Sequence, residues 1–123
     1  MQIKTIFREF WKMTEQISPF KALDFIRDNA QAYATAKANV VYMMEYRKSL
    51  KAILMQEATD LKTESAKETY AYANQSYIDH LKAIQEAVSE AERLRWLMVG
   101  AEARIEVWRS LESSARMEIK GAQ

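Results

Sequence analysis

The sequence is poor in the residues that turn a chain. It holds two glycines and one proline among 123 residues, and these two residue types build many tight turns. Few connections are therefore expected, and most of the chain must lie in a small number of long helices. About half of the residues are apolar, and they recur at helical rather than alternating spacing. The prediction is a single all-α domain, which suits this length.

Periodicity and capping residues divide the chain into helical segments. Ser18 followed by Pro19 is a typical pair of N-cap and first-turn proline. Thr63 is expected to cap a short helix, and Asn74 is expected to end it. Ser76 is expected to cap the last helix. The predicted elements are an accessory helix at 2–16, a first long helix at 19–57, a connection with a short helix at 59–76, and a second long helix at 77–119.

Each long helix carries one apolar seam at near-heptad spacing. Two helices of about 60 Å joined by a short connection predict an antiparallel hairpin, in which the seams meet. A three-residue slip in each seam predicts coiled-coil packing that changes pitch midway. The first seam is interrupted at Arg47 and otherwise consists of Leu23, Ile26, Ala30, Tyr33, Ala36, Val40, Met43, Leu50 and Leu54. The second seam consists of Tyr77, Leu81, Ile84, Val88, Ala91, Leu94, Met98, Ala101, Ile105 and Trp108.

The stretch VVYMMEYRKSLKAILM, at residues 40–55, is apolar on nearly every side. Outside the seam, one face carries Val41, Met44 and Met55, and another carries Tyr42, Tyr46 and Ile53. One partner helix covers only one face, so burial of the others requires further chains. The prediction is a homo-oligomer with the candidate interface residues Tyr42, Met44, Tyr46, Ile53 and Trp96. The alternative is a three-helix bundle completed by residues 2–16.

The charges are unevenly distributed along the chain. Residues 57–92 carry three cations and eight acids, whereas the rest of the chain has an excess of six cations. Folded as a hairpin, the connecting end is acidic and the end that holds both termini is basic. A positive region beside aromatic side chains can receive a phosphate backbone and stack unpaired bases. The candidate nucleic-acid-binding residues are Lys37, Arg47, Lys48, Lys51, Arg93, Arg104 and Arg109.

These cations also have a simpler interpretation. Most charge runs on helices are solvated faces with pairs between residues i and i+4. In the expected hairpin, Lys48 and Lys51 would lie near Glu86, which can neutralise them. The sequence does not decide between a binding face and a solvated one.

Catalytic, metal and cofactor motifs are absent from the sequence. The chain has no cysteine, which excludes disulfides and thiolate metal sites and fits a reducing cytoplasm. Its one histidine, His80, is expected at the surface in the first turns of the last helix. Two glycines cannot build a phosphate-binding loop, and Ser110, Ser113 and Ser114 have no base placed to activate them. We expect no enzymatic activity, no cofactor and no metal.

Membrane association has little support in the sequence. No secretory signal is expected, and no apolar run approaches the roughly 20 residues of a membrane span. Peripheral binding through residues 2–16 is a third possible function. It depends on Ile3, Phe7, Phe10 and Trp11 lying opposite Arg8 and Lys12. Glu9 and the shortness of the segment count against it.

The tracts AYATAKANVVYMMEYRKSLKAILMQEA, AYANQSYIDHL and ERLRWLMVGAEARIEVWRS combine a long-helix pattern with scattered Tyr, Lys and Arg. They resemble small helical proteins encoded beside recombination and replication genes in tailed phages. In plan, roughly residues 30–118 are similar to UvsY-type recombination mediators. The resemblance implies a protein that forms rings, binds single-stranded DNA and helps load a recombinase onto strands covered by single-strand binding protein. It also implies that Lys37, Arg47, Lys48 and Lys51 contact DNA, although the acidic connection departs from the basic charge expected of a mediator.

The expected function is single-stranded DNA binding in phage recombination or replication, in the cytoplasm of a bacterial host. The expected partners are further copies of the chain, single-stranded DNA, and a recombinase or single-strand binding protein. The alternative is a helical adaptor that binds other proteins and no nucleic acid. In that case the basic end would be covered by an acidic surface of the partner.

Overall fold

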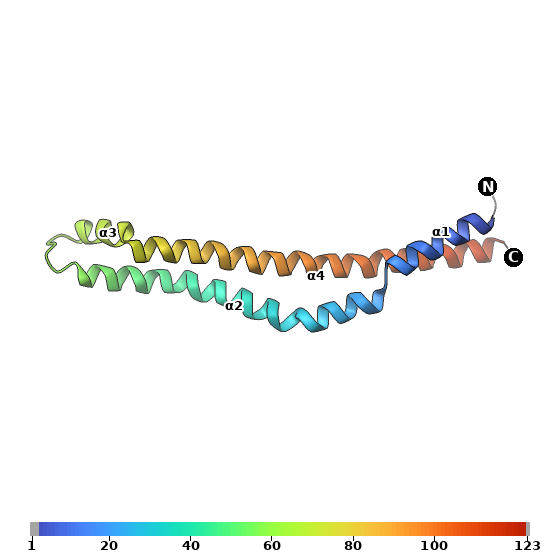
Figure 1. The fold of residues 1–123 in the computed structure, drawn as a ribbon, viewed down its shortest axis with the longest axis horizontal. Coiled ribbons are helices and arrows are strands. Elements are labelled where there is room, and N and C mark those ends of the chain that lie inside the picture. The colour runs from blue at the N-terminus through green and yellow to red at the C-terminus, as the bar shows by residue number, and fades with distance from the viewer. Residues whose placement is uncertain (1–2, 123) are drawn as a thin grey trace. The chain divides into compact units, whose positions relative to one another are not determined.

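The computed structural model describes the backbone of residues 3–122 and the side chains of residues 3–9 and 17–122. Over this range every regular element is an α-helix, which confirms the all-α prediction. Figure 1 shows the helices in order. They are α1 (Ile3–Gln16), α2 (Pro19–Glu57), α3 (Glu64–Ala73) and α4 (Gln75–Gly121). The side chains of Phe10, Trp11 and Lys12, on which peripheral membrane binding partly depends, lie outside the described residues.

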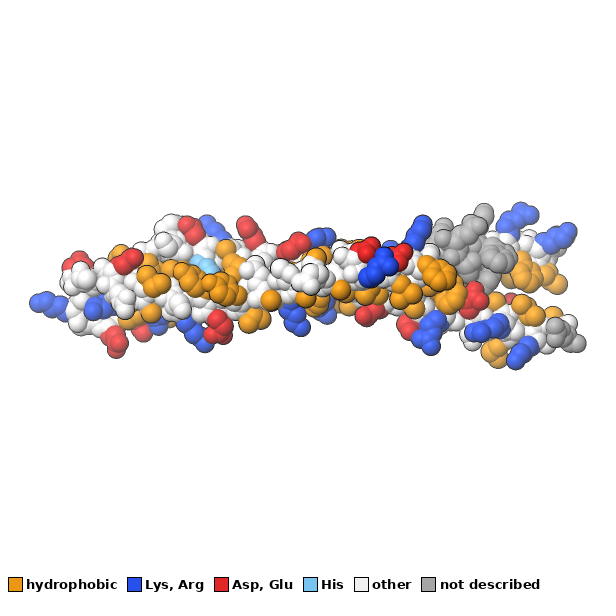
Figure 2. Space-filling view, turned by 90° about the horizontal axis from the view of Figure 1, so that it is seen from below, with side chains coloured by type: hydrophobic (Ala, Val, Ile, Leu, Met, Phe, Trp, Pro, Cys, Tyr) orange, Lys and Arg blue, Asp and Glu red, His pale blue; other side chains and the backbone are white. Residues whose placement is uncertain are grey.

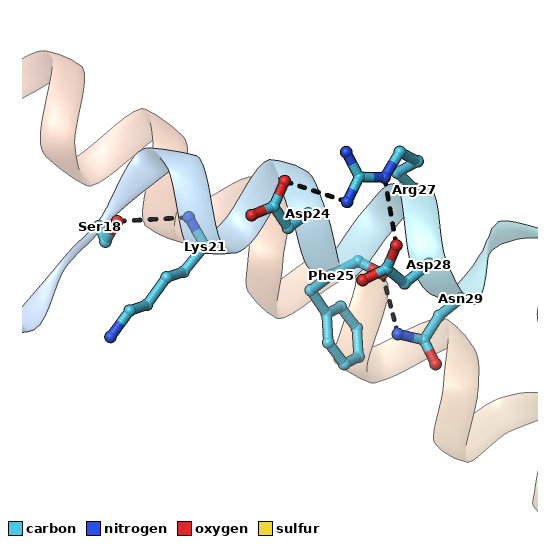
Figure 3. A network of polar contacts seen from close by, with 7 residues as sticks. All are labelled: Ser18, Lys21, Asp24, Phe25, Arg27, Asp28 and Asn29. Carbon is cyan, nitrogen blue, oxygen red and sulfur yellow. Dashed lines mark hydrogen bonds and ion pairs between the residues drawn. The ribbon is translucent and has the colours of Figure 1, made fainter.

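The start of α2 follows the predicted capping pattern. The backbone N–H of Lys21 donates to the Ser18 hydroxyl over 3.3 Å, as Figure 3 shows. The N–H of Ala22 donates to the Ser18 carbonyl over 3.2 Å. Pro19 has no N–H to satisfy and its fixed φ suits the first helical turn. The cap therefore separates α2 from α1 after a break of only two residues.

The junction between α3 and α4 is organised by one residue, Asn74. Its backbone N–H donates to the Ala71 carbonyl and closes α3, as predicted. Its side-chain oxygen accepts from the N–H of Ser76 over 2.9 Å. Its backbone carbonyl accepts from the N–H groups of Tyr77 and Ile78. The prediction that Ser76 caps the last helix is therefore wrong, because Asn74 already satisfies the first donors of α4. As a result, α4 begins two residues earlier than expected.

At the other end of α3, the predicted N-cap is confirmed. The Thr63 hydroxyl accepts from the N–H of Ala66 over 3.1 Å, and the Thr63 backbone is extended. Threonine is a favoured N-cap because its hydroxyl satisfies an N–H that has no partner within the helix. The capped first turn fixes where α3 starts and hence which of its residues share a face.

The chain divides into two compact units. We call residues 31–94 the hairpin unit and residues 1–30 with 95–123 the terminal unit. Both α2 and α4 contribute a part to each unit. Residues 40–55 belong to the hairpin unit, whereas α1 belongs to the terminal unit.

In the hairpin unit, α2 and α4 run antiparallel and α3 connects them (Figure 1). A buried cluster of Leu54, Ala71 and Tyr77 joins all three helices, with Leu50 and Met55 packed against it. Ala71 is fully buried, and its small side chain allows α3 to approach α2 closely. This cluster fixes α3 against the neighbouring part of α2.

His80 also lies between the helices of the hairpin unit. Its Nε2 atom is 2.7 Å from the Met43 carbonyl of α2. Its ring contacts Tyr46 edge to face, with centroids 5.4 Å apart. His80 is half-buried, whereas the expected seam residue Leu81 is exposed. The prediction of a surface histidine is therefore wrong, because a carbonyl of α2 satisfies the ring nitrogen and allows the polar ring to occupy the seam.

The terminal unit shows a second departure from the predicted seam of α2. Leu23 is 53% exposed, whereas Ala22 is buried and Asn29 is half-buried. The Asn29 amide donates to the Phe25 carbonyl over 2.9 Å (Figure 3), so a polar residue can occupy the seam. The seam positions are Ala22, Ile26, Asn29, Tyr33, Ala36, Val40, Met43, Arg47, Leu50 and Leu54.

This corrected seam alternates four- and three-residue steps without a break. The slip predicted in α2 is therefore wrong, and it arose from placing Leu23 and Ala30 in the seam. In α4 the same alternation runs through the buried and half-buried positions Tyr77, His80, Ile84, Ala87, Ala91, Leu94, Met98, Ala101, Ile105 and Trp108. The slip predicted in α4 is therefore wrong as well, and it arose from placing Leu81 in the seam.

Within the terminal unit, α1 lies beside the last turns of α4. Their apolar side chains line an open pocket. The lining includes Ile3, Ile6 and Phe7 of α1 and Leu111, Ala115 and Ile119 of α4. The described part of α1 therefore directs an apolar face toward α4, as its amphipathic pattern predicts.

Candidate nucleic-acid interface

Three of the predicted cations meet two tyrosines in the hairpin unit. Arg47, Lys48 and Lys51 of α2 line an open pocket together with Tyr72 of α3 and Tyr77 of α4. We call these five residues the basic pocket. All three helices of the unit contribute to it. Its geometry therefore depends on how α3 packs against α2 and α4.

The tyrosines reach the basic pocket because of the buried cluster beneath it. Tyr77 is buried within that cluster, and Tyr72 directly follows the fully buried Ala71. The two rings contact each other edge to face, with centroids 5.2 Å apart. This arrangement is favourable for aromatic rings. The Tyr72 side chain remains on the outer side, and the residue is 47% exposed.

Lys51 is held by two side chains of α3. Its Nζ atom lies 3.2 Å from a carboxylate oxygen of Glu68 and 4.9 Å from the centroid of the Tyr72 ring. The Tyr72 hydroxyl, and then the Glu68 carboxylate, raise the pKa of Lys51 above its ordinary value against an opposing effect of desolvation. Both partners therefore stabilise the charged form of Lys51.

Lys48 and Lys51 do not have the partner that the sequence predicts. Lys48 donates to Glu45 of the same helix over 3.3 Å, and the Lys51 partner is Glu68. The prediction that Glu86 neutralises these two lysines is therefore wrong. The connecting helix α3 packs against α2 at this point and supplies the carboxylate for Lys51 instead.

Arg47 and Lys37 form no ion pair with the described residues. Arg47 occupies a seam position yet is exposed, and it lines the basic pocket. Lys37 is also exposed but lies ten residues earlier, about 15 Å along the helix axis. The structure thus separates Lys37 from the three cations with which the resemblance groups it.

The three predicted arginines of α4 do not line the basic pocket. Arg93, in the hairpin unit, makes two hydrogen bonds to Glu90, the shorter of 2.8 Å. This contact raises the pKa of Arg93 and lowers that of Glu90. In the terminal unit, Arg109 pairs with Glu106 over 3.0 Å, whereas Arg104 has no ion pair among the described side chains. These pairs span one turn of a single helix and fit the solvated-face interpretation.

The predicted interface residues are exposed apolar side chains. Tyr42 is 67% exposed and Met44 is 42% exposed, and Tyr46 and Ile53 are exposed as well. The rings of Tyr42 and Tyr46 stack, with centroids 6.1 Å apart. Figure 2 shows apolar side chains at the surface of this unit, between charged ones. Trp96 is exposed too, but it belongs to the terminal unit and lies beside the Arg95 guanidinium.

Sequence reasoning missed Glu68, Tyr72 and Tyr77 as parts of the site. Glu68 and Tyr72 are four residues apart, so they share one face of a helix. The Thr63 cap, read correctly from the sequence, places both within α3. What the sequence does not contain is the docking of that face against Lys51.

The described residues contain neither a candidate metal-binding group nor a candidate membrane-spanning helix. Within them, no three His, Asp or Glu side chains gather in a way that could hold a metal ion. No described helix combines the length and apolar character needed to cross a membrane. Comparison with protein families, curated proteins and solved structures finds no match to this chain.

Proposed function

We propose that the protein binds single-stranded DNA as an accessory factor of phage recombination or replication. The observation that supports this function is the basic pocket, where Arg47, Lys48 and Lys51 line the same open pocket as the exposed ring of Tyr72. Cations beside an accessible ring match the two chemical features of a single strand, its phosphates and its unpaired bases. The resemblance of three tracts to UvsY-type mediators points to the same function.

In this proposal the cations bind the phosphates and Tyr72 binds a base. The Arg47 guanidinium has no carboxylate partner among the described residues, so its charge is available to a phosphate. Lys48 is paired only with an exposed Glu45, and such surface pairs contribute at most about 1 kcal/mol. A phosphate can therefore replace Glu45 at little cost. Neither group reads base identity, so binding should be largely independent of sequence.

The proposed protein has no catalytic role. It would act in the cytoplasm of a bacterial host, as an assembly of several copies, together with a recombinase or single-strand binding protein. The exposed apolar faces of the hairpin unit support self-association, because they leave large side chains in water. Those same faces favour the second candidate function, a helical adaptor that binds other proteins and no nucleic acid.

Fluorescence anisotropy with a labelled oligo(dT) strand tests the proposal. The logarithm of the affinity should fall linearly with the logarithm of salt concentration, since each phosphate contact releases bound cations. Combining Arg47→Ala with Lys48→Ala should weaken binding and reduce the magnitude of that slope by about 1.4, at roughly 0.7 for each contact. Lys82→Ala is the control, because Lys82 is an exposed cation of the same unit outside the pocket.

Two outcomes contradict the proposed site or function. If Lys82→Ala weakens binding as much as the double substitution, the pocket is not the site. If the wild-type protein gives no anisotropy change even at low salt, it does not bind single-stranded DNA. The adaptor function then takes its place.

A further inference from the structure

Glu68 holds the position that a phosphate would need in order to reach Lys51. We propose that Glu68 is a built-in competitor of the basic pocket, which occupies Lys51 in the free protein and is displaced from it when single-stranded DNA binds. The inference rests on the proposed function of the pocket. It adds regulation of that pocket by the protein's own carboxylate.

The geometry of Lys51 carries this inference. Its ammonium lies on the Tyr72 ring on one side and contacts the Glu68 carboxylate on another. A phosphate oxygen that accepts from Nζ would take the place of the carboxylate oxygen, because both are anionic acceptors of the same kind. Glu68 is the one carboxylate paired with Lys51 among the described residues. Displacing it therefore removes the competing anion, while Tyr72 still holds the ammonium in the pocket.

The exposure of the pair indicates that this exchange is feasible. The side chain of Lys51 is 28% exposed and that of Glu68 is 48% exposed. Partly exposed ion pairs are weak, since solvent and salt screen them. Released from Lys51, the Glu68 carboxylate can return to water without a large penalty. We therefore expect the contact to compete with a single phosphate and to yield to a strand.

The competition should favour a strand over a single phosphate. A lone phosphate at Lys51 replaces one anion by another and gains little. Neighbouring phosphates of a strand can contact Arg47 and Lys48 at the same time, since these cations line the same pocket. The additional contacts offset the displacement of Glu68. We therefore expect inorganic phosphate to be a poor competitor for oligo(dT) at equal ionic strength.

Charge-matched variants of α3 test the inference. Glu68→Gln keeps the shape of the side chain and removes the competing charge. It should tighten oligo(dT) binding by up to about fivefold, the equivalent of a weak surface ion pair. Glu64→Gln removes the same charge from an exposed position one turn earlier and should change affinity much less. Glu68→Ala should repeat the effect of Glu68→Gln, and circular dichroism verifies that each variant is folded.

Repeating the Glu68→Gln substitution in a Lys51→Ala protein distinguishes two explanations. Glu68 acts either through its contact with Lys51 or through long-range repulsion of the DNA. In the Lys51→Ala protein, Glu68→Gln should no longer tighten binding, because the competed cation is gone. If the gain persists there, or if Glu64→Gln gives the same gain, Glu68 acts through its general field and the inference is overturned. The inference also fails, while the proposed function stands, if the wild type binds and Glu68→Gln leaves affinity unchanged or weakens it. Absence of binding by every protein defeats both.

Discussion

Lys51 contacts more than one kind of group at the same atom. Its Nζ atom pairs with a carboxylate and lies over an aromatic ring, and both partners come from α3. A raised pKa means that the fold stabilises the charged form. That contribution is fully present below the ordinary lysine pKa of about 10.4. It is lost as the pH rises through the higher pKa of the folded protein.

The titration of Lys51 should depend on both of its partners. Tyr72→Phe and Glu68→Gln should each lower the pKa of Lys51, because each removes a group that raises it. The measurement is the pH dependence of the lysine ¹³Cε chemical shift by NMR. Glu64→Gln is the control, since Glu64 makes no contact that perturbs Lys51. An unchanged Lys51 midpoint in both variants would show that α3 does not hold the ammonium.

Tyr72 provides a second prediction at the scale of a residue. Stacking requires the ring and not the hydroxyl, so Tyr72→Ala should weaken oligo(dT) binding by about 1–3 kcal/mol while Tyr72→Phe retains most of it. Tyr70→Ala is a matched control, because Tyr70 is an exposed tyrosine of α3 that does not line the pocket. Equal losses for Tyr70→Ala and Tyr72→Ala would argue against a base on the Tyr72 ring.

At the scale of the element, Asn74 gives a prediction about stability. It ends α3 and caps α4, so Asn74→Ala should lower the free energy of unfolding by about 1 kcal/mol, within the range for lost N-caps. Urea unfolding followed by circular dichroism measures the change. Ser76→Ala should be nearly neutral, since the first turn of α4 uses the backbone N–H of Ser76 as a donor to Asn74. A larger loss for Ser76→Ala would restore the cap predicted from the sequence.

The elements also show what a sequence can and cannot reveal. Pro19 and Thr63 predict the starts of their helices correctly, because caps and prolines act through local backbone chemistry. The seam of α2 is predicted wrongly at Leu23. Leucine is usually buried and asparagine usually exposed, but here Leu23 is exposed and Asn29 is half-buried. The surface position predicted for His80 is wrong, and Glu68 is absent from the predicted site, for a related reason. Their roles depend on contacts with Met43 and Lys51, which only the packing of separate helices creates.

At the scale of the whole molecule, uncovered apolar surface is the dominant feature of the hairpin unit. Val41, Tyr42 and Ile53 are all exposed. They belong to residues 40–55, the stretch that is apolar on nearly every side. A two-helix contact buries one stripe of each helix. The remaining faces are suited to contact with further chains.

Association is therefore the prediction for the whole molecule. Light scattering or native mass spectrometry at micromolar concentration should show an oligomer. Met44→Glu should reduce its mass while helix content, measured by circular dichroism, stays nearly constant. Gln85→Glu adds the same charge at an exposed polar position and should leave the oligomer intact. A wild-type protein that is monomeric throughout this concentration range would contradict the prediction.

Heptad packing is nearly periodic along a helix axis, so two apolar seams can fit almost as well after sliding by one heptad, about 10 Å. His80 favours one of these alignments in the hairpin unit through its ring contact with Tyr46. A slide of seven residues would move its ring from Met43 to Leu50 or Ala36, and would take it away from Tyr46. The only histidine of the chain therefore helps to set the register of α4 against α2. Its edge-to-face contact with Tyr46 is lost in an alignment displaced by one heptad, which favours the observed one.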